Sequence, residues 1–243
     1  MVSVISMYLA EFLGTMLLII FGDGAVATAV LRKSKGENGG WITITAGWGL
    51  GVAIAVYVTG WISGGHINPA VTIAQASIGM FSWSLVPGYI AAQVAGAFVG
   101  AVLVYLAYMD HFRATDDPAT KLAVFSTGPQ IRNLASNFVT EVIGTTILVV
   151  GVLGVTNENN QIGALGALTV GILVWVIGLS LGGPTGYAIN PARDLGPRIA
   201  HAILPIPNKG SSDWKYGLVV PIFGPLVGGL IGAWVYQAFV ALV

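Results

Sequence analysis

The sequence predicts an all-α membrane protein with six transmembrane helices and two re-entrant half-helices, arranged as an inverted 3+3 repeat. Three observations lead to this prediction. Of the 243 residues, 55% are hydrophobic and only 8% are charged, whereas soluble domains carry about 25% charged residues. Six apolar stretches are each near the roughly 20 residues that cross the hydrocarbon layer. The tripeptide Asn-Pro-Ala occurs twice, at 68–70 and at 190–192.

The apolar stretches give the order of the spans. They are predicted at about 7–31, 41–62, 85–109, 134–155, 161–182 and 216–241. Two shorter segments, 64–79 and 186–202, are too short to cross, so we expect half-helices that are buried in protein or line a water-filled path. No basic residue precedes Arg32, so the first stretch lacks the charged start of a cleaved signal peptide and is expected to remain as a helix.

Each Asn-Pro-Ala tripeptide predicts the start of a half-helix. Asparagine is a preferred N-cap, and proline suits the first helical position because its missing N–H costs nothing there. Paired half-helix N-termini at membrane depth are typical of a site for a small polar molecule near the bilayer midplane. The alternative is that each asparagine only caps its helix. The candidate residues are Asn68, Pro69, Ala70, Asn190, Pro191 and Ala192.

The two halves of the chain repeat. Residues 10–15 (AEFLGT) match 140–145 (TEVIGT), and each glutamate is followed two spans later by its Asn-Pro-Ala. Three spans are an odd number, so the second half enters the membrane from the opposite side and the half-helices approach the midplane from opposite faces. We therefore divide the single domain, 1–243, into a first repeat (1–109), a connecting loop (110–133) and a second repeat (134–243).

Composition argues against several other classes of protein. Ten Lys/Arg balance ten Asp/Glu, so no basic face favours nucleic acid. Cysteine is absent, and the three histidines, at 66, 111 and 201, lack metal-ligand spacing. No phosphate-binding loop or nucleophile motif is present. We expect no metal, no cofactor and no enzymatic activity.

These motifs resemble the major intrinsic proteins, the aquaporins and glycerol facilitators, over essentially the whole chain, and the glycerol-facilitator branch fits best. The resemblance implies that Asn68 and Asn190 meet at a pore centre and donate hydrogen bonds to the solute. Each half-helix N-terminus carries about half a positive charge, which would exclude cations and protons while neutral molecules pass. The resemblance also implies a track of backbone carbonyls from Gly64, Gly65, His66, Ile67, Gly186, Tyr187, Ala188 and Ile189.

The resemblance further implies a selectivity filter of Trp48, Gly178, Tyr187 and Arg193. Arg193 would donate to hydroxyls and repel cations, and Trp48 would form a flat apolar wall. Gly178 stands where water-selective members have histidine, so the aperture would admit a three-carbon polyol. Asp194 is also typical of the glycerol branch. Tyr187 departs from that branch's usual phenylalanine, and its hydroxyl either lies at the aperture or points away from the pore.

Glu11 and Glu141 lie in apolar spans, where ionisable residues are usually functional or paired. One interpretation is a proton relay. The resemblance implies instead that both glutamates support the loops carrying the half-helices, with His66 as the partner of Glu141 and Asp194 as a further support. The partner of Glu11 is not assigned.

The predicted function is a passive channel for glycerol and other small neutral solutes, including water and with urea as a further candidate, that excludes ions and protons. The expected partners are these solutes and the lipid bilayer, and the resemblance implies a homotetramer. The nearest alternative is a water-selective aquaporin. More remote are an energy-coupled secondary transporter, with Glu11 and Glu141 as its candidate coupling groups, and a membrane scaffold without a pore.

The membrane orientation is predicted differently by charge and by resemblance. All ten Lys/Arg residues fall on one side of the six-span arrangement, and the positive-inside rule puts that side in the cytoplasm. The resemblance instead puts both termini in the cytoplasm, in the plasma membrane. We follow the resemblance because Arg193 belongs to the predicted pore rather than to a loop.

Overall fold

The computed structural model describes residues 2–242, and the regular secondary structure in that range is entirely helical. Six helices are long and apolar enough to cross a membrane, so the chain is a multi-pass membrane protein. The predicted spans are confirmed, with ends that shift by a few residues. The spanning helices are α1 (Val4–Val30), α2 (Gly40–Ser63), α4 (Val86–Ala107), α7 (Leu134–Val155), α8 (Gly166–Leu181) and α11 (Val220–Val240).

The two half-helices begin where the Asn-Pro-Ala tripeptides predict. Helix α3 (Pro69–Ser77) is capped by Asn68, whose Oδ1 accepts from the N–H of Ala70 at 2.9 Å. Helix α9 (Pro191–Ile203) is capped by Asn190, whose Oδ1 accepts from the N–H of Ala192 at 3.0 Å. Both caps satisfy N–H groups that the first turn of a helix leaves without an internal partner.

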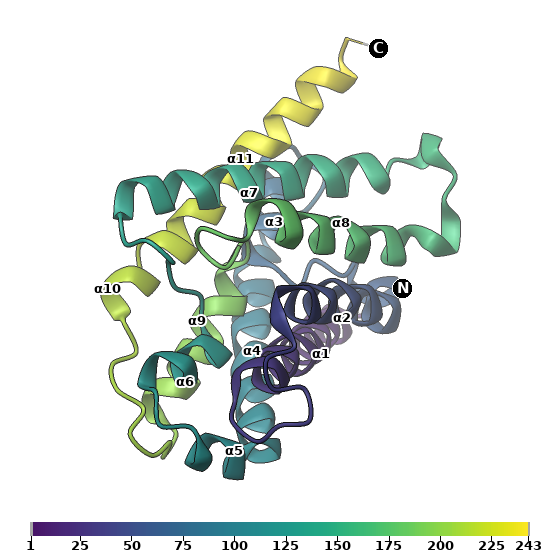
Figure 1. Cartoon of the computed structure of the whole chain (residues 1–243). Coiled ribbons are helices and arrows are strands. Elements are labelled where there is room, and N and C mark those ends of the chain that lie inside the picture. The colour runs from purple at the N-terminus through teal and green to yellow at the C-terminus, as the bar shows by residue number, and fades with distance from the viewer. Residues whose placement is uncertain (1, 243) are drawn as a thin grey trace.

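The helices are arranged as two equivalent sets that exchange their half-helices. Helix α1 packs against α2 and α4, and in the second repeat α7 packs against α8 and α11. Helices α2 and α8 pack against each other across the repeats. Each half-helix packs against a spanning helix of the other repeat, α9 against α4 and α3 against α11 (Figure 1). This interlocking brings the N-termini of α3 and α9 into the interior of the bundle.

Glycines let the helices within each repeat approach closely. A Cβ on Gly96 of α4 would lie 2.1 Å from the carbonyl oxygen of Phe12 in α1, and one on Gly228 of α11 would lie 2.3 Å from that of Val142 in α7. Side chains there would force the backbones apart, as expected for small residues at helix contacts in lipid. Gly178 of α8 differs, because its nearest neighbour is the ring of Tyr187.

The connection between the repeats is more ordered than the predicted loop. It contains α5 (Met109–Ala114) and α6 (Pro118–Phe125). Asp117 caps α6, and hydrogen bonds from the hydroxyl and backbone N–H of Thr120 lower the pKa of its carboxyl. The remaining short elements are η1 (Glu158–Asn160), η2 (Gly163–Leu165) and α10 (Trp214–Gly217).

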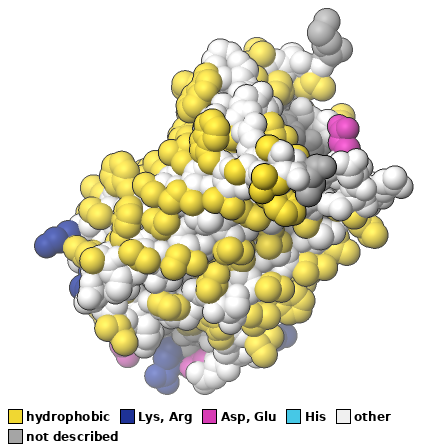
Figure 2. Space-filling model, turned by 90° about the horizontal axis from the view of Figure 1, so that it is seen from above, with side chains coloured by type: hydrophobic (Ala, Val, Ile, Leu, Met, Phe, Trp, Pro, Cys, Tyr) yellow, Lys and Arg dark blue, Asp and Glu magenta, His cyan; other side chains and the backbone are white. Residues whose placement is uncertain are grey.

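The outer surface is apolar, as a lipid-facing surface must be. Hydrophobic side chains are spread over the whole face shown in Figure 2, and the Lys and Arg side chains lie toward its margins. Exposed members from five of the spanning helices include Leu9, Trp61, Leu106, Val176 and Trp234.

Candidate functional site

A cavity of about 340 Å³ runs between the two repeats. Its wall includes both asparagine caps, Trp48 of α2 and Arg193 of α9, and it reaches Met80 beyond the end of α3. Aliphatic side chains from both repeats make up much of the remaining wall. They include Leu18, Val52, Val56, Val71, Leu148, Val152, Leu153, Val170 and Val174.

The two asparagine caps are joined through each other's loops. Asn68 Nδ2 donates to the carbonyl oxygen of Ile189 at 2.8 Å, and Asn190 Nδ2 donates to that of Ile67, also at 2.8 Å. A side-chain amide has two N–H donors and one acceptor oxygen. The oxygen caps the half-helix and one N–H crosses to the other repeat, so each asparagine has one N–H left for the cavity it lines.

The segments before the caps are held in unusual backbone conformations. Gly64, Gly65 and Gly186 have φ of 86°, 65° and 82°, and the non-glycine residues Ile67 and Ile189 both have φ of 43°. Positive φ is costly for branched side chains and persists only where the surroundings impose it. The predicted carbonyl-track residues other than Gly186 line the cavity.

Two buried carboxylates impose that conformation. Glu11 accepts from the backbone N–H groups of His66 at 3.0 Å and Ile67 at 2.6 Å. Glu141 accepts from those of Ala188 at 3.0 Å and Ile189 at 2.8 Å. The N–H groups of both loops are thereby bound on the side away from the cavity, so the carbonyls are the backbone groups left to face a solute.

The predicted pairing of His66 with Glu141 is wrong. His66 Nδ1 contacts the hydroxyl of Thr72 at 3.1 Å, and its backbone N–H donates to Glu11. Each glutamate holds the loop of its own repeat, because the half-helix of that repeat starts directly beside it. Glu11 also accepts from Ser63 and Gln93, both at 2.7 Å. Sequence reasoning missed Gln93, although an amide within an apolar span was a usable signal.

The predicted selectivity filter is assembled around two aromatic rings. The guanidinium carbon of Arg193 lies 3.8 Å from the ring centroid of Trp48. Tyr187 packs edge-to-face on Trp41 with centroids 5.8 Å apart. Trp48, Tyr187 and Arg193 all line the cavity. Gly178 does not, but a Cβ there would lie 2.7 Å from Cζ of Tyr187, so the glycine makes room for the tyrosine ring.

Three polar atoms of this group have no hydrogen-bond partner among residues 2–242. The hydroxyl of Tyr187, Nη1 of Arg193 and Nε1 of Trp48 are buried without hydrogen bonds. Buried polar groups in native proteins are usually satisfied, so these atoms are suited to hydrogen bonding with a molecule in the cavity. Trp41, which sequence reasoning missed, donates from Nε1 to the carbonyl of Gly178 at 3.0 Å and fixes the end of α8 beside Tyr187.

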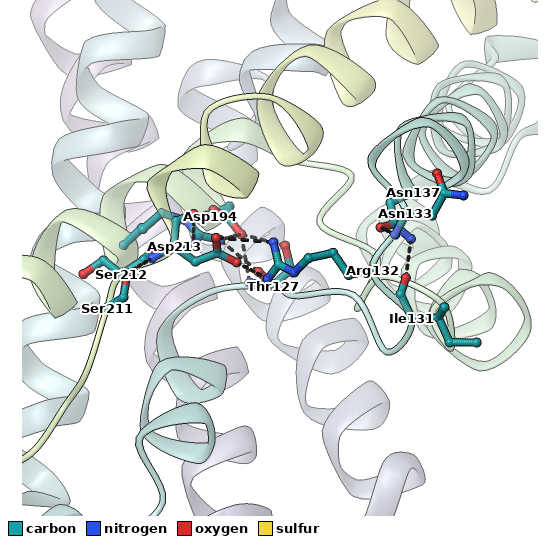
Figure 3. Close-up of polar contacts among 10 residues, drawn as sticks. Thr127, Ile131, Arg132, Asn133, Asn137, Asp194, Ser211, Ser212 and Asp213 are labelled. Atoms are coloured by element: carbon teal, nitrogen blue, oxygen red, sulfur yellow. Dashed lines mark hydrogen bonds and ion pairs between the residues drawn. The ribbon is translucent and has the colours of Figure 1, made fainter.

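Behind the filter, Asp194 belongs to a buried polar cluster. Its Oδ1 pairs with Nε of Arg198 at 2.7 Å, and both side chains are fully buried. Its Oδ2 accepts from the backbone N–H of Thr127 at 2.8 Å, while Arg198 donates to the carbonyls of Thr127 and Ser212. Figure 3 shows Asp194, Thr127 and Ser212 drawn together from separate segments. The cluster ties α9 to the connection between the repeats and to the segment before α10.

This fold and site define a class of membrane protein: an inverted repeat in which two half-helices meet at an interior cavity. The chain belongs to the major intrinsic protein family, whose model matches residues 1–236.

Three similar proteins support this assignment. The chain is 65% identical over 232 residues to the probable glycerol uptake facilitator protein of Thermotoga maritima, covering 96% of this chain and 98% of the relative. It is 58% identical over 228 residues to the glycerol uptake facilitator protein of Bacillus subtilis, covering 94% and 82%. The X-ray structure of the aquaglyceroporin from Plasmodium falciparum matches with a TM-score of 0.88 at 33% identity, covering 99% of this chain and 100% of that one.

Proposed function

We propose that the protein is a passive transmembrane channel for glycerol and other small neutral solutes, with water among them and urea as a further candidate. The observation that carries the proposal is the filter itself, where Arg193 lies 3.8 Å over Trp48 and lines the same cavity as Tyr187. Unpartnered donors lie there beside aromatic faces. The names of the relatives, glycerol uptake facilitators, support glycerol as the solute.

The cavity wall suits a molecule with hydroxyls on one edge and carbons on the other. Donors come from Arg193 and from the remaining N–H of each asparagine, and acceptors come from the carbonyls before the caps. Aliphatic side chains such as Val52 and Leu148 offer an apolar wall. A polyol can exchange hydrogen bonds along the polar side while its carbons stay out of water, so its passage needs no large conformational change.

Ions and protons are excluded by the charge at the centre. The N-termini of α3 and α9 both lie there, each with about half a positive charge, and Arg193 adds a full charge close by. A cation would lose hydration and meet positive potential. Because each asparagine offers only a donor to the cavity, a central water acts as acceptor on both sides and is poorly placed to relay a proton.

The glutamates favour a channel over an energy-coupled transporter. In both Glu11 and Glu141, each carboxylate oxygen accepts at least one backbone N–H. A coupling carboxylate has to gain and lose a proton during transport, and protonation here would break bonds that hold the loops. We infer that both are structural supports, as is Asp194.

Uptake of labelled glycerol into proteoliposomes, with and without an imposed proton gradient, tests the proposal. A passive channel brings internal glycerol to the external concentration and no further under both conditions. Accumulation above that level with the gradient would establish a coupled transporter instead. Glycerol uptake no faster than in protein-free liposomes would contradict a glycerol channel. If water flux were also absent, the result would support a membrane scaffold without a pore, and if water flux were present, it would support a water-selective aquaporin.

We also propose the assembly and orientation that the resemblance implies. The protein is a homotetramer in the plasma membrane, with one pore per subunit and both termini in the cytoplasm. Its first repeat ends at residue 109 and its second begins at residue 134. Lipid-facing aliphatic surfaces on the spanning helices are available for subunit contacts. Labelling from outside at cysteines introduced into 33–39 and 156–160 tests the orientation. Reaction confined to 156–160 would reverse it.

A further inference from the structure

One buried carboxylate belongs neither to the cavity wall nor to the supports of the half-helix loops. Asp23 lies in the last third of the apolar helix α1 and is 0% exposed. Both of its carboxylate oxygens are buried without a hydrogen-bond partner. It is not among the residues that line the cavity. Burying an ionisable group without a partner is costly, so its presence in a membrane span needs a reason.

The charged groups that act on Asp23 come from the start of α9. Burial opposes the charge of Asp23 most strongly, Arg193 favours that charge, and Asp194, which is already paired with Arg198, opposes it. Helix α1 packs against α9 and, more extensively, against α2. The residue before Asp23 is Gly22, where a Cβ would lie 2.2 Å from the ring of Trp48. Asp23 therefore adjoins, along α1, the residue that packs on the Trp48 ring over which Arg193 lies.

The acceptors and donors in this region are complementary. Asp23 contributes two unpartnered acceptor oxygens, and Nη1 of Arg193 and Nε1 of Trp48 are unpartnered donors. None of the four ion pairs among residues 2–242 includes Arg193. Asp23 is thus the uncommitted buried carboxylate that acts on the guanidinium.

The inverted repeat shows what this position holds when no arginine is present. Asp23 follows Glu11 by twelve residues, and Leu153 follows Glu141 by the same number. Arg193 follows Asn190 by three residues, and Val71 likewise follows Asn68. The pair Asp23 and Arg193 therefore corresponds to Leu153 and Val71, two buried apolar residues. An acid therefore occurs where the corresponding half-helix position is arginine, and a leucine occurs where it is valine.

We propose that Asp23 is a positioning residue for the selectivity filter, and that its carboxylate balances the charge of the Arg193 guanidinium from behind the cavity wall without contacting it. This rests on the proposed function of the cavity. Asp23 touches no solute and acts through Arg193. The attraction favours the position of the guanidinium against the face of Trp48, from which the N–H groups of Arg193 can donate to hydroxyls in the cavity.

The test is a double-mutant cycle, with the glycerol-to-water permeability ratio measured by stopped flow on proteoliposomes. Asp23→Asn is expected to lower the ratio roughly threefold or more, the scale of coupling between charged neighbours. In an Arg193→Val background the same substitution is expected to leave the ratio unchanged. Leu153→Asn is the control from the equivalent point of the other repeat. Because Leu153 lines the cavity, this substitution changes the ratio by itself, but its effect should not depend on Arg193.

Thermal unfolding of the same proteins gives a second, flux-independent readout. Arg193→Val strands the Asp23 carboxylate and is expected to lower the Tm by roughly 4 °C or more. The double variant Asp23→Leu/Arg193→Val reproduces the apolar pair of the other repeat and is expected to recover most of that loss. This comparison of Tm values tests the role of Asp23 even if Asp23→Asn fails to fold.

Two results would overturn the proposal. One is a glycerol-to-water permeability ratio in Asp23→Asn equal to that of the parent protein. The other is a decrease in Tm in Arg193→Val that the added Asp23→Leu substitution does not reverse. A parent protein that conducts no glycerol would refute the proposed function instead. The Tm comparison would still report on Asp23 in that case.

Discussion

The side chains of Asn68 and Asn190 lock the two repeats together as well as capping their own helices. Each donates one N–H to the carbonyl that precedes the other asparagine, both at 2.8 Å. The interpretation of the asparagines as caps and their interpretation as pore residues are therefore compatible, because one amide has enough hydrogen-bonding groups for both. The arrangement also fixes which N–H of each amide is left for a solute.

The first prediction concerns the space beside Tyr187. A Cβ at residue 178 would lie 2.7 Å from Cζ of Tyr187 and 2.9 Å from Cγ2 of Thr45, so Gly178→His must displace the tyrosine ring into the aperture. We expect glycerol flux to fall roughly tenfold or more, as for misplacement at a site of precise geometry, while water flux stays measurable in stopped-flow liposome assays. Gly183→Ala is the control, because nothing lies within 4 Å of its added carbon. Unchanged glycerol flux in Gly178→His would place residue 178 away from the constriction.

The second prediction isolates one oxygen atom. The hydroxyl of Tyr187 has no protein partner, so Tyr187→Phe should leave the stability within about 0.5 kcal/mol, as for substitutions that break no contact. Removing the hydroxyl makes the rim of the aperture wider and less polar, and we expect the glycerol-to-water permeability ratio to rise. A ratio equal to that of the parent would show that the hydroxyl lies outside the solute path.

The fold was largely predictable from the sequence because its signals are strong and local. Six apolar stretches and two capped half-helices are visible without any tertiary information, and the Glu11 and Glu141 repeat supplies the inversion. The sequence does not show which side chain hydrogen-bonds to which loop. Glu11 and His66 are 55 residues apart, and their contact runs through a backbone N–H, which leaves no side-chain pattern to recognise.

The site was predictable only in part, for the same reason. Trp48 and Arg193 were expected from the family resemblance, but the role of Trp41 depends on where α8 ends against the loop before α9. Asp23 was overlooked because, unlike Glu11, it has no acidic counterpart in the second repeat, although an acid within an apolar span was a usable signal. The helices α5 and α6 were taken as loop because segments of six and eight residues carry little periodicity.

The third prediction concerns the glutamate supports. Glu141 accepts one backbone N–H on each carboxylate oxygen, and a glutamine can replace only one of these acceptors while its NH₂ opposes the other donor. We expect Glu141→Gln to cost about 1–3 kcal/mol, the penalty for an unsatisfied buried group, and to reduce glycerol flux. Thermal unfolding in detergent measures the loss, with Glu158→Gln in the exposed η1 segment as the control. Full stability in Glu141→Gln would mean that the carboxylate does not hold the loop.

The fourth prediction concerns the buried pair Asp194 and Arg198. Removing one partner strands a charge and several loop carbonyls, so Arg198→Met is expected to lower stability by about 3–5 kcal/mol. The solvent-exposed pair Asp110 and Arg113 is the matched comparison, and Arg113→Met should change the unfolding temperature little because exposed ion pairs contribute weakly. Equal effects of the two substitutions would contradict a structural role for the buried pair.

The central claim is that a path for small neutral solutes passes between Asn68 and Asn190. Stopped-flow swelling of proteoliposomes in a panel of glycerol, urea, water and a potassium salt tests it most directly. The account predicts that glycerol and water enter faster than in protein-free liposomes, while the potassium salt does not. Glycerol entry no faster than in protein-free liposomes, from protein that retains its helical circular dichroism, would contradict it.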